Sequence, residues 1–430
     1  MSYRTLTFLF MPESAFGPTN NCIGIARVLT ARGHRVVFAA EASWRGKLEA
    51  LGFEEDLVDL APPAEGEQDP GKFWKDFIQQ TAPEFRKPTI EQLDTWVKPV
   101  WQELINGARY CEPALRAIIE RNRPDVIIED NVVAFPALLT AGVPYVRIVS
   151  CNPLEMKGSG VAPTFSGYPA DDSSGWDAFR AEYDRTHREL WQEFDEWVRE
   201  QGAPALPDLE FIHTGDLNLY VYPKEADYLD RRPLDASWHR IDSCVRETDS
   251  ELVIPQEFLD RPEPLIYFSL GSLGSADVEL MRRVLSVLAV TPYRFIVSKG
   301  PLHAEIELAD NMWGAEQVPQ TRVLPLCDLV MTHGGNNTTT ESLHFGKPMI
   351  VLPLFWDQYD NAQRIDELGL GIRLDTYRFT NEELTDALSR LLKDTDLRER
   401  VAAIGAGIRE RNGLTRAADL VEGLGSSAQR

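Results

Sequence analysis

Between residues 332 and 358, the residue types and their spacing indicate a site for a phosphate-bearing ligand. Gly334 and Gly335 follow the short apolar run 329–331, which is typical of a strand buried on both faces. Glycines at such a point let the backbone turn tightly or let a ligand come close. Asn337 and three threonines then predict the start of a helix. Because the first turn of a helix presents unpaired N–H groups and the positive end of the dipole, this turn could hold a diphosphate.

The same stretch carries side chains that suit the other parts of a nucleotide sugar. The ring of His333 and the hydroxyl of Thr338 lie where they could add hydrogen bonds to phosphate oxygens. Glu341, one turn into the predicted helix, is an acceptor placed for ribose hydroxyls, and Asp357 and Gln358 follow the next buried strand, where they suit a sugar. Each feature alone is more often a turn or a cap. Their order on one strand–helix–strand unit predicts a nucleotide-sugar site.

Residues 332–342 (THGGNNTTTES) and 353–362 (PLFWDQYDNA) resemble the donor-binding signature of the inverting, nucleotide-diphosphate-sugar-dependent glycosyltransferases of family 1. In plants this signature is called the secondary-product glycosyltransferase box. The resemblance implies that His333, the Gly335 backbone and the helix start bind the diphosphate, while Gly271 and Ser272 form a second phosphate turn. The donor residues that we expect are Gly271, Ser272, Gln317, Val318, His333, Gly335, Asn336, Asn337, Thr338, Glu341, Asp357 and Gln358.

One position departs from the family pattern. The family usually carries an aromatic residue just before Val-Pro-Gln, where it stacks on the nucleotide base, and this chain has Gln317 there. Trp313 lies four residues earlier. We expect UDP-glucose as the donor, with dTDP-sugars left open.

The catalytic motif of the family is broken in this chain. A strand at 3–11, a loop at 12–21 and a helix ending at Arg32-Gly33-His34 match the family's opening, in which a Gly-His-x-x-Pro loop carries the catalytic base. The histidine position is Pro18, which cannot accept a proton. The resemblance aligns Asp130 with the aspartate that normally orients this histidine, so Asp130 could act through water or directly as the base. Glu13 is the other candidate carboxylate. An acceptor acidic enough to need little help, or a chain without activity, would also fit.

Composition limits the classes of partner. The 430 residues carry a formal net charge of −23, which argues against nucleic acid or an anionic membrane as a partner. The five cysteines are scattered and show no metal spacing, which fits a reducing compartment. The chain opens directly on a strand, and no apolar run reaches the roughly 18–20 residues of a membrane helix. We therefore expect a cytoplasmic protein without membrane insertion, metal or cofactor, for which the UDP-sugar is a co-substrate.

Strand and helix patterns alternate along the chain and predict an α/β fold with doubly wound sheets. The resemblance implies the GT-B type, in which two such sheets face each other across an interdomain cleft. We expect an acceptor-binding domain at 1–242, a linker at 243–262 and a donor-binding domain at 263–413. The C-terminal helix, about 414–430, should pack back on the first domain. An aromatic-rich insertion at 64–113 and an amphipathic helix at 176–200 could build an apolar acceptor pocket.

These observations predict an inverting transferase that moves glucose from UDP-glucose to a hydroxyl of an apolar or aromatic small molecule, such as a natural product. The alternative is a non-catalytic GT-B protein that binds nucleotide sugars or assists another transferase, and Pro18 is its main support. An epimerase on the same architecture is disfavoured, because the donor box is of the transferase type.

Overall fold

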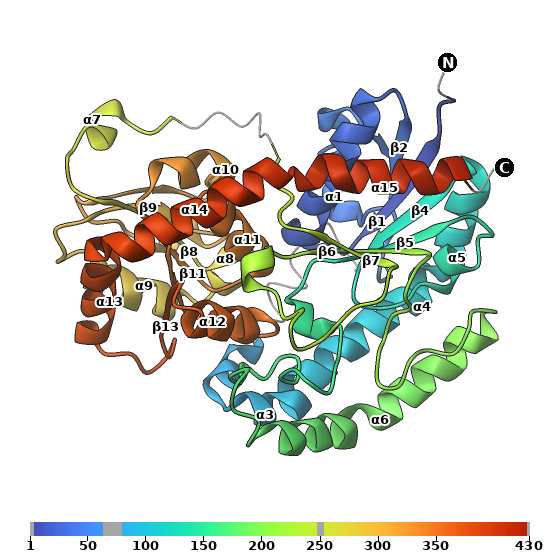
Figure 1. The fold of residues 1–430 in the computed structure, drawn as a ribbon, viewed down its shortest axis with the longest axis horizontal. Helices are drawn as coiled ribbons and strands as arrows, with labels where there is room; N and C mark the ends of the chain where they lie inside the picture. Colours follow the sequence, from blue (N-terminus) through green and yellow to red (C-terminus); the bar gives the residue numbers. More distant parts are fainter. Residues whose placement is uncertain (1–3, 63–79, 247–252, 428–430) are drawn as a thin grey trace.

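The computed structural model describes residues 4–62, 80–246 and 253–427, which build two parallel β-sheets with helices on both faces (Figure 1). The first sheet has the strand order β3-β2-β1-β4-β5-β6-β7 and the second the order β10-β9-β8-β11-β12-β13. Within the described residues every strand pairing is parallel, so the predicted doubly wound α/β architecture is confirmed. The part of the aromatic insertion at 64–79 and the linker residues 247–252 lie outside the described residues.

The strands of the first sheet are mostly apolar, because helices cover both faces of a parallel sheet. They are β1 (Thr7–Pro12), β2 (Arg35–Phe38), β3 (Glu54–Glu55), β4 (Val126–Asp130), β5 (Tyr145–Val149), β6 (Leu217–Val221) and β7 (Trp238–Ile241). The second sheet contains β8 (Leu265–Ser269), β9 (Arg294–Ser298), β10 (Met312–Ala315), β11 (Leu329–Thr332), β12 (Met349–Val351) and β13 (Gly371–Arg373).

The short helix α7 (Gln256–Leu259) falls in the predicted linker. The helices of the first half are α1 (Phe16–Ala31), α3 (Thr89–Gln92), α4 (Lys98–Asn122), α5 (Pro136–Leu139) and α6 (Trp176–Glu200). Those of the second half are α8 (Gly271–Gly274), α9 (Val278–Leu288), α10 (Gln320–Val323), α11 (Asn336–His344), α12 (Gln358–Glu367), α13 (Asn381–Lys393), α14 (Thr395–Arg411) and α15 (Gly413–Ser427).

The first helix begins earlier than the sequence predicts. We expected a loop through residue 21, but α1 starts at Phe16 after a three-residue connection. No side chain caps the helix at Ala15, so the sequence carries no cap signal. Pro18 falls in the first turn, where its missing N–H leaves no intrahelical bond unmade.

The last helix returns to the first domain. Figure 1 shows α14 and α15 running along one side of the molecule from the second sheet to the first. Ala417, Ala418 and Val421 join the buried cluster on the α1 face of the first sheet. Arg32, at the end of α1, forms ion pairs with Asp419 (2.6 Å) and Glu422 (2.7 Å). The domain boundaries at 242, 262 and 413 remain our proposal.

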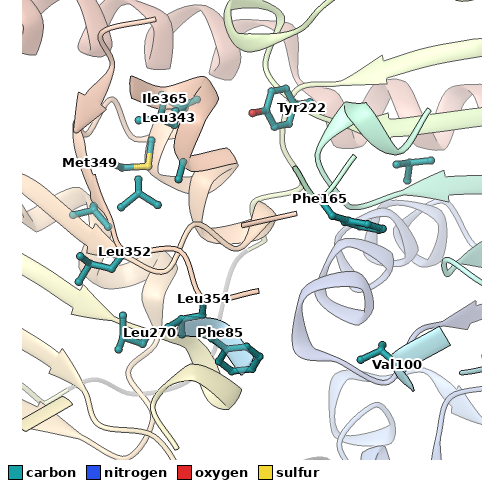
Figure 2. Packing of buried hydrophobic residues seen from close by; sticks show 14 of the residues in the cluster. Phe85, Val100, Phe165, Tyr222, Leu270, Leu343, Met349, Leu352, Leu354 and Ile365 are labelled. Carbon is teal, nitrogen blue, oxygen red and sulfur yellow. The ribbon is translucent and has the colours of Figure 1, made fainter. Parts of the chain in front are cut away.

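Buried side chains run continuously through the domain interface. Phe85 of the first domain belongs to the same apolar cluster as Leu270 and Leu354 of the second, and Figure 2 shows the three close together (Figure 2). The loop at 152–175 is also part of the interface. The backbone N–H groups of Phe165 and Gly167 donate to the carboxylate of Asp360 on α12, at 2.6 and 2.8 Å. The interface therefore holds the two sheets in a defined arrangement.

Candidate functional site

The predicted diphosphate site is the connection from β11 to α11. Gly334 takes a φ of +85°, and Gly335 is the residue before the helix. No side chain caps this helix, and the amides of its first turn have no acceptor within the helix. These amides and the positive end of the dipole are therefore available to an anion.

The ring of His333 lies between two glycines. A Cβ at Gly335 would come within 2.6 Å of His333 Nε2, and one at Gly271 within 2.8 Å. Glycine at both positions thus lets the ring sit against the α11 turn. Burial lowers the pKa of His333 to about 4, so its ring is neutral at pH 7 and offers an N–H rather than a charge. Ser272 is exposed beside this turn, at the start of α8.

Glu341, the expected ribose acceptor, is buried and already engaged. Arg246 donates to its Oε1 at 2.9 Å, and the side-chain amide of Gln320 donates to its Oε2 at 2.6 Å. Thr338 in turn donates to the carbonyl oxygen of Gln320 at 3.3 Å. Gln320 therefore belongs to the candidate donor site, although the sequence patterns above did not single it out. Its signal was present, since it closes the Val-Pro-Gln triplet that sets the expected base position.

The two residues expected beside the nucleotide base, Gln317 and Val318, differ in their exposure to solvent. Gln317 is exposed and Val318 is buried, immediately before α10. Trp313 lies on β10, which is the edge strand of the second sheet, and is partly buried.

Asp357 and Gln358 lie at the start of α12 and have different surroundings. The backbone N–H of Asn152, from the first domain, donates to Asp357 Oδ2 at 2.8 Å. Burial raises the pKa of Asp357 to about 7. Gln358 Oε1 accepts from the backbone N–H groups of Leu354 and Phe355, at 3.1 and 3.3 Å. Gln358 thus holds its own loop, while Asp357 faces the other domain.

The two candidate bases lie beside each other at the ends of β1 and β4. The Glu13 N–H donates to the Asp130 carbonyl oxygen at 2.7 Å. Ser150 donates to Asp130 Oδ2 at 2.6 Å, and Asn21 donates to the Ser150 hydroxyl at 2.8 Å. Burial raises the pKa of Asp130 to about 8 and that of Glu13 to about 7. For Asp130, the charge of Glu13 is a further cause.

The start of α1 connects this pair to the donor site. The side-chain amide of Asn337, in the first turn of α11, donates to the Gly17 carbonyl oxygen at 3.2 Å. Asn336 donates to the Val221 carbonyl oxygen at the end of β6, at 3.0 Å. Pro18, next to Gly17, is partly buried and offers no titratable group. The structure thus brings the predicted donor residues and the candidate bases to one interface, whereas Ser272 and Gln317 stand at its exposed margin.

Comparison with known proteins finds similar chains among glycosyltransferases. Residues 295–418 match the model of the "Erythromycin biosynthesis protein CIII-like, C-terminal domain". The "NDP-glycosyltransferase YjiC" of Bacillus subtilis (strain 168) is 24% identical over 415 residues, which cover 95% of this chain and 94% of that protein. The "Oleandomycin glycosyltransferase" of Streptomyces antibioticus is 27% identical over 422 residues, 95% of this chain and 88% of the relative. The resemblance to the family 1 glycosyltransferases is confirmed.

Solved glycosyltransferases share the fold. The "Glycotransferase of kitacinnamycin" superposes with a TM-score of 0.71 at 24% identity, covering 98% of this chain and all of the other. "Glycosyltransferase VinC in complex with DTDP" superposes with a TM-score of 0.66 at 18% identity, over 98% and 100% of the two chains. The GT-B fold is therefore confirmed. Because the two relatives found by sequence are named as glycosyltransferases, the non-catalytic alternative is not favoured.

Two kinds of feature are absent from the part of the chain that the structure describes. In 4–62, 80–246 and 253–427 no helix has both the length and the apolar character needed to cross a membrane. The same residues contain no group of three or more His, Cys, Asp or Glu side chains that could hold a metal ion.

Proposed function

We propose that this chain transfers a sugar, with inversion, from a nucleoside diphosphate sugar to a hydroxyl of an apolar or aromatic small molecule such as a natural product. The observation that carries the proposal is the uncapped start of α11, with His333 packed between Gly271 and Gly335 at the interface that also holds Asp130. A diphosphate leaving group needs such a concentration of donors when it takes up charge in the transition state.

The donor would lie along α11. Its phosphates would accept hydrogen bonds from the amides at the helix start and from the neutral ring of His333. Glu341 and Gln320 would hold the ribose, since they already form one hydrogen-bonded pair. Asp357 and Gln358 would face the sugar hydroxyls. We assign no metal to the transfer, because the helix start supplies the neutralising partial charge.

The reaction is a single displacement at the anomeric carbon. The acceptor oxygen forms a bond to C1 of the sugar, and the bond from C1 to the phosphate oxygen breaks with its electron pair, which leaves on the nucleoside diphosphate. The acceptor proton passes to the ionised carboxylate of Asp130, directly or through one water. Attack on the face opposite the leaving group inverts the anomeric configuration. Glu13 is placed to share the titration of Asp130.

UDP-glucose is the donor that we propose first. A dTDP-sugar is the second candidate, and the thymidine nucleotide named with VinC supports including it. Gln317 stands where the family usually has an aromatic residue that stacks on the nucleotide base. We therefore expect the site to select the base less strongly than the diphosphate.

A thermal-shift panel with UDP, dTDP, GDP and ADP, repeated with the matching sugar nucleotides, tests this proposal. A ligand that binds only the folded chain raises the melting temperature by mass action, by about 2.7 kcal/mol of stability at 100 times its Kd. A shift with UDP or dTDP, and none with GDP or ADP, is the expected result. If none of the nucleotides shifts the melting temperature, the α11 turn does not bind a donor. The alternative of a non-catalytic protein that assists another transferase is then favoured.

A further inference from the structure

Two large aromatic residues with left-handed backbone conformations pack against each other in this molecule. Five non-glycine residues of the described chain have a positive φ. Two of them, Arg123 and Asn412, end α4 and α14, where the left-handed conformation is common. The other three are Phe165 (φ 68°), Leu209 (φ 55°) and Trp356 (φ 57°). A left-handed conformation is unfavourable for large side chains and persists only where the surroundings impose it.

Two of these three residues, Phe165 and Trp356, belong to a single group of rings. The rings of Phe165 and Trp356 are 4.3 Å apart at an interplanar angle of 40°. The ring centroids of Trp356 and Trp101 are 5.3 Å apart. Trp101 stacks on Phe211 with a centroid distance of 4.3 Å and an interplanar angle of 20°. Leu209 lies two residues before Phe211. We call Trp101, Phe165, Phe211 and Trp356 the aromatic clamp.

The aromatic clamp joins both domains, and its residue Trp356 is the chain neighbour of Asp357. Trp356 comes from the second domain and directly precedes Asp357. Phe165 comes from the first domain, and its N–H is held by Asp360 at 2.6 Å; Figure 2 shows it on the first-domain side of the interface. The Phe211 carbonyl oxygen accepts from the Ala134 N–H at 2.7 Å, and Ala134 lies four residues beyond Asp130.

Ordinary packing between the domains does not require this strain. Phe355, the neighbour of Trp356, packs on Phe85 at 5.1 Å and on Trp96 at 5.5 Å. None of these three residues has a positive φ. The same interface therefore contains a relaxed aromatic contact and a strained one, side by side in the sequence. Trp356 is also partly exposed, whereas Trp101, Phe165 and Phe211 are buried.

We propose that the aromatic clamp takes up a flat aromatic ring of the acceptor, with Trp356 as the residue that selects aromatic over saturated acceptors. This inference rests on the proposed glycosyl transfer and specifies its acceptor class. Trp356 and Phe165 would part so that the acceptor ring stacks on them, because offset or tilted ring contacts add affinity beyond the burial of apolar area. Asp357, next in the chain, then keeps the donor sugar beside that ring.

Calorimetric titration of the full chain, saturated with UDP, measures this selectivity. The probes are 2-naphthol and 2-decalol, which share a ten-carbon bicyclic skeleton and a hydroxyl but differ in aromaticity. The wild type should bind 2-naphthol more tightly than 2-decalol. Trp356→Leu should weaken 2-naphthol roughly 2- to 12-fold, the range of one aromatic pair contact, and change 2-decalol less than about 2-fold. Trp356→Phe, which keeps a ring, should restore most of the preference.

Phe355→Leu is the matched control, since it removes an interface aromatic with a relaxed backbone. It should lower the melting temperature without changing the ratio of the two affinities. The proposal would be overturned if the wild type bound both probes equally, or if Trp356→Leu lost the same affinity for both. The wild-type comparison does not depend on whether the variant folds. Absence of any UDP-induced melting shift would instead contradict the proposed function itself.

Discussion

The backbone N–H of Glu13 donates to the carbonyl oxygen of Asp130 at 2.7 Å, so that two carboxyl groups from the ends of β1 and β4 are neighbours. Burial raises the pKa of both, to about 7 for Glu13 and about 8 for Asp130. A carboxylate with a raised pKa is a stronger base than an ordinary aspartate once it is ionised. This pair therefore offers a base to a chain whose usual histidine position is Pro18.

Replacing Asp130 by Asn should reduce transfer to alcohol acceptors by about 10²- to 10⁴-fold, the usual contribution of a general base. The affinity for UDP, measured by calorimetry, should stay within about 2-fold. In the wild type, kcat/KM should rise with pH to a plateau above an apparent pKa near 8, and Asp130→Asn should lose this limb. Full activity of the variant on alcohols would exclude Asp130 as the base. Activity that survives only on acidic phenols would point to acceptors that ionise without help.

The same raised pKa predicts how stability depends on pH. Between pH 3.8, the ordinary pKa of an aspartate, and about pH 8, the unfolded chain has Asp130 ionised while the folded chain keeps it protonated. The folded state binds more protons, so its stability falls as pH rises through this window and levels off above it. One proton corresponds to about 1.4 kcal/mol per pH unit. Urea unfolding of the wild type and Asp130→Asn between pH 5 and 8 should show the shallower decline in the variant, and parallel curves would contradict the assignment.

Gly335→Ala should impair donor binding through His333. The added Cβ would come within 2.6 Å of His333 Nε2, and the ring must leave its place against the α11 turn. We expect UDP affinity to fall about 10-fold or more, because a ring donor and the close backbone approach are lost together. Gly423→Ala, on α15, is the matched control, since nothing lies within 4 Å of its added Cβ. Unchanged UDP affinity in Gly335→Ala would place the diphosphate elsewhere.

Glu341→Gln should distinguish a ribose from a deoxyribose donor. A carboxylate that accepts from both ribose hydroxyls contributes more to UDP than to dTDP, which lacks the 2′-hydroxyl. Hydrogen bonds to charged groups contribute about 1.5–3 kcal/mol, so UDP affinity should fall at least about 10-fold and dTDP affinity less. Equal losses for both nucleotides would mean that Glu341 acts through its contacts with Arg246 and Gln320 rather than through the ribose.

The sequence predicts the donor half of the site because its residues are nearly contiguous. The glycines after β11, the start of α11 and Asp357 all lie in one strand–helix–strand unit, whose local patterns carry the information. Arg246 could not be found in this way, since it lies 95 residues from Glu341 and meets it only through the path of the linker. Gln320 was visible in the motif but was not assigned a role.

The acceptor half is less readable from the sequence. The start of α1 at Phe16 was hidden because Ala15 does not cap it and Pro18 is typical of a loop. Trp356 and Phe165 adopt left-handed conformations that their residue types disfavour, so the local sequence does not predict these conformations. Their contact depends on how two domains pack, which neither loop specifies alone.

Transfer of a sugar with inversion can be tested directly by proton NMR of the product. UDP-glucose, whose glucose is α-linked, would be incubated with the wild type and 2-naphthol, and the anomeric coupling of any naphthyl glucoside would be measured together with UDP release. We expect a β-glucoside formed in equal amount to UDP. If the thermal-shift panel favours dTDP, the same product measurement is made with a dTDP-sugar. An α-linked product, or no product from a chain that binds the nucleotide, would contradict the proposed transfer with inversion.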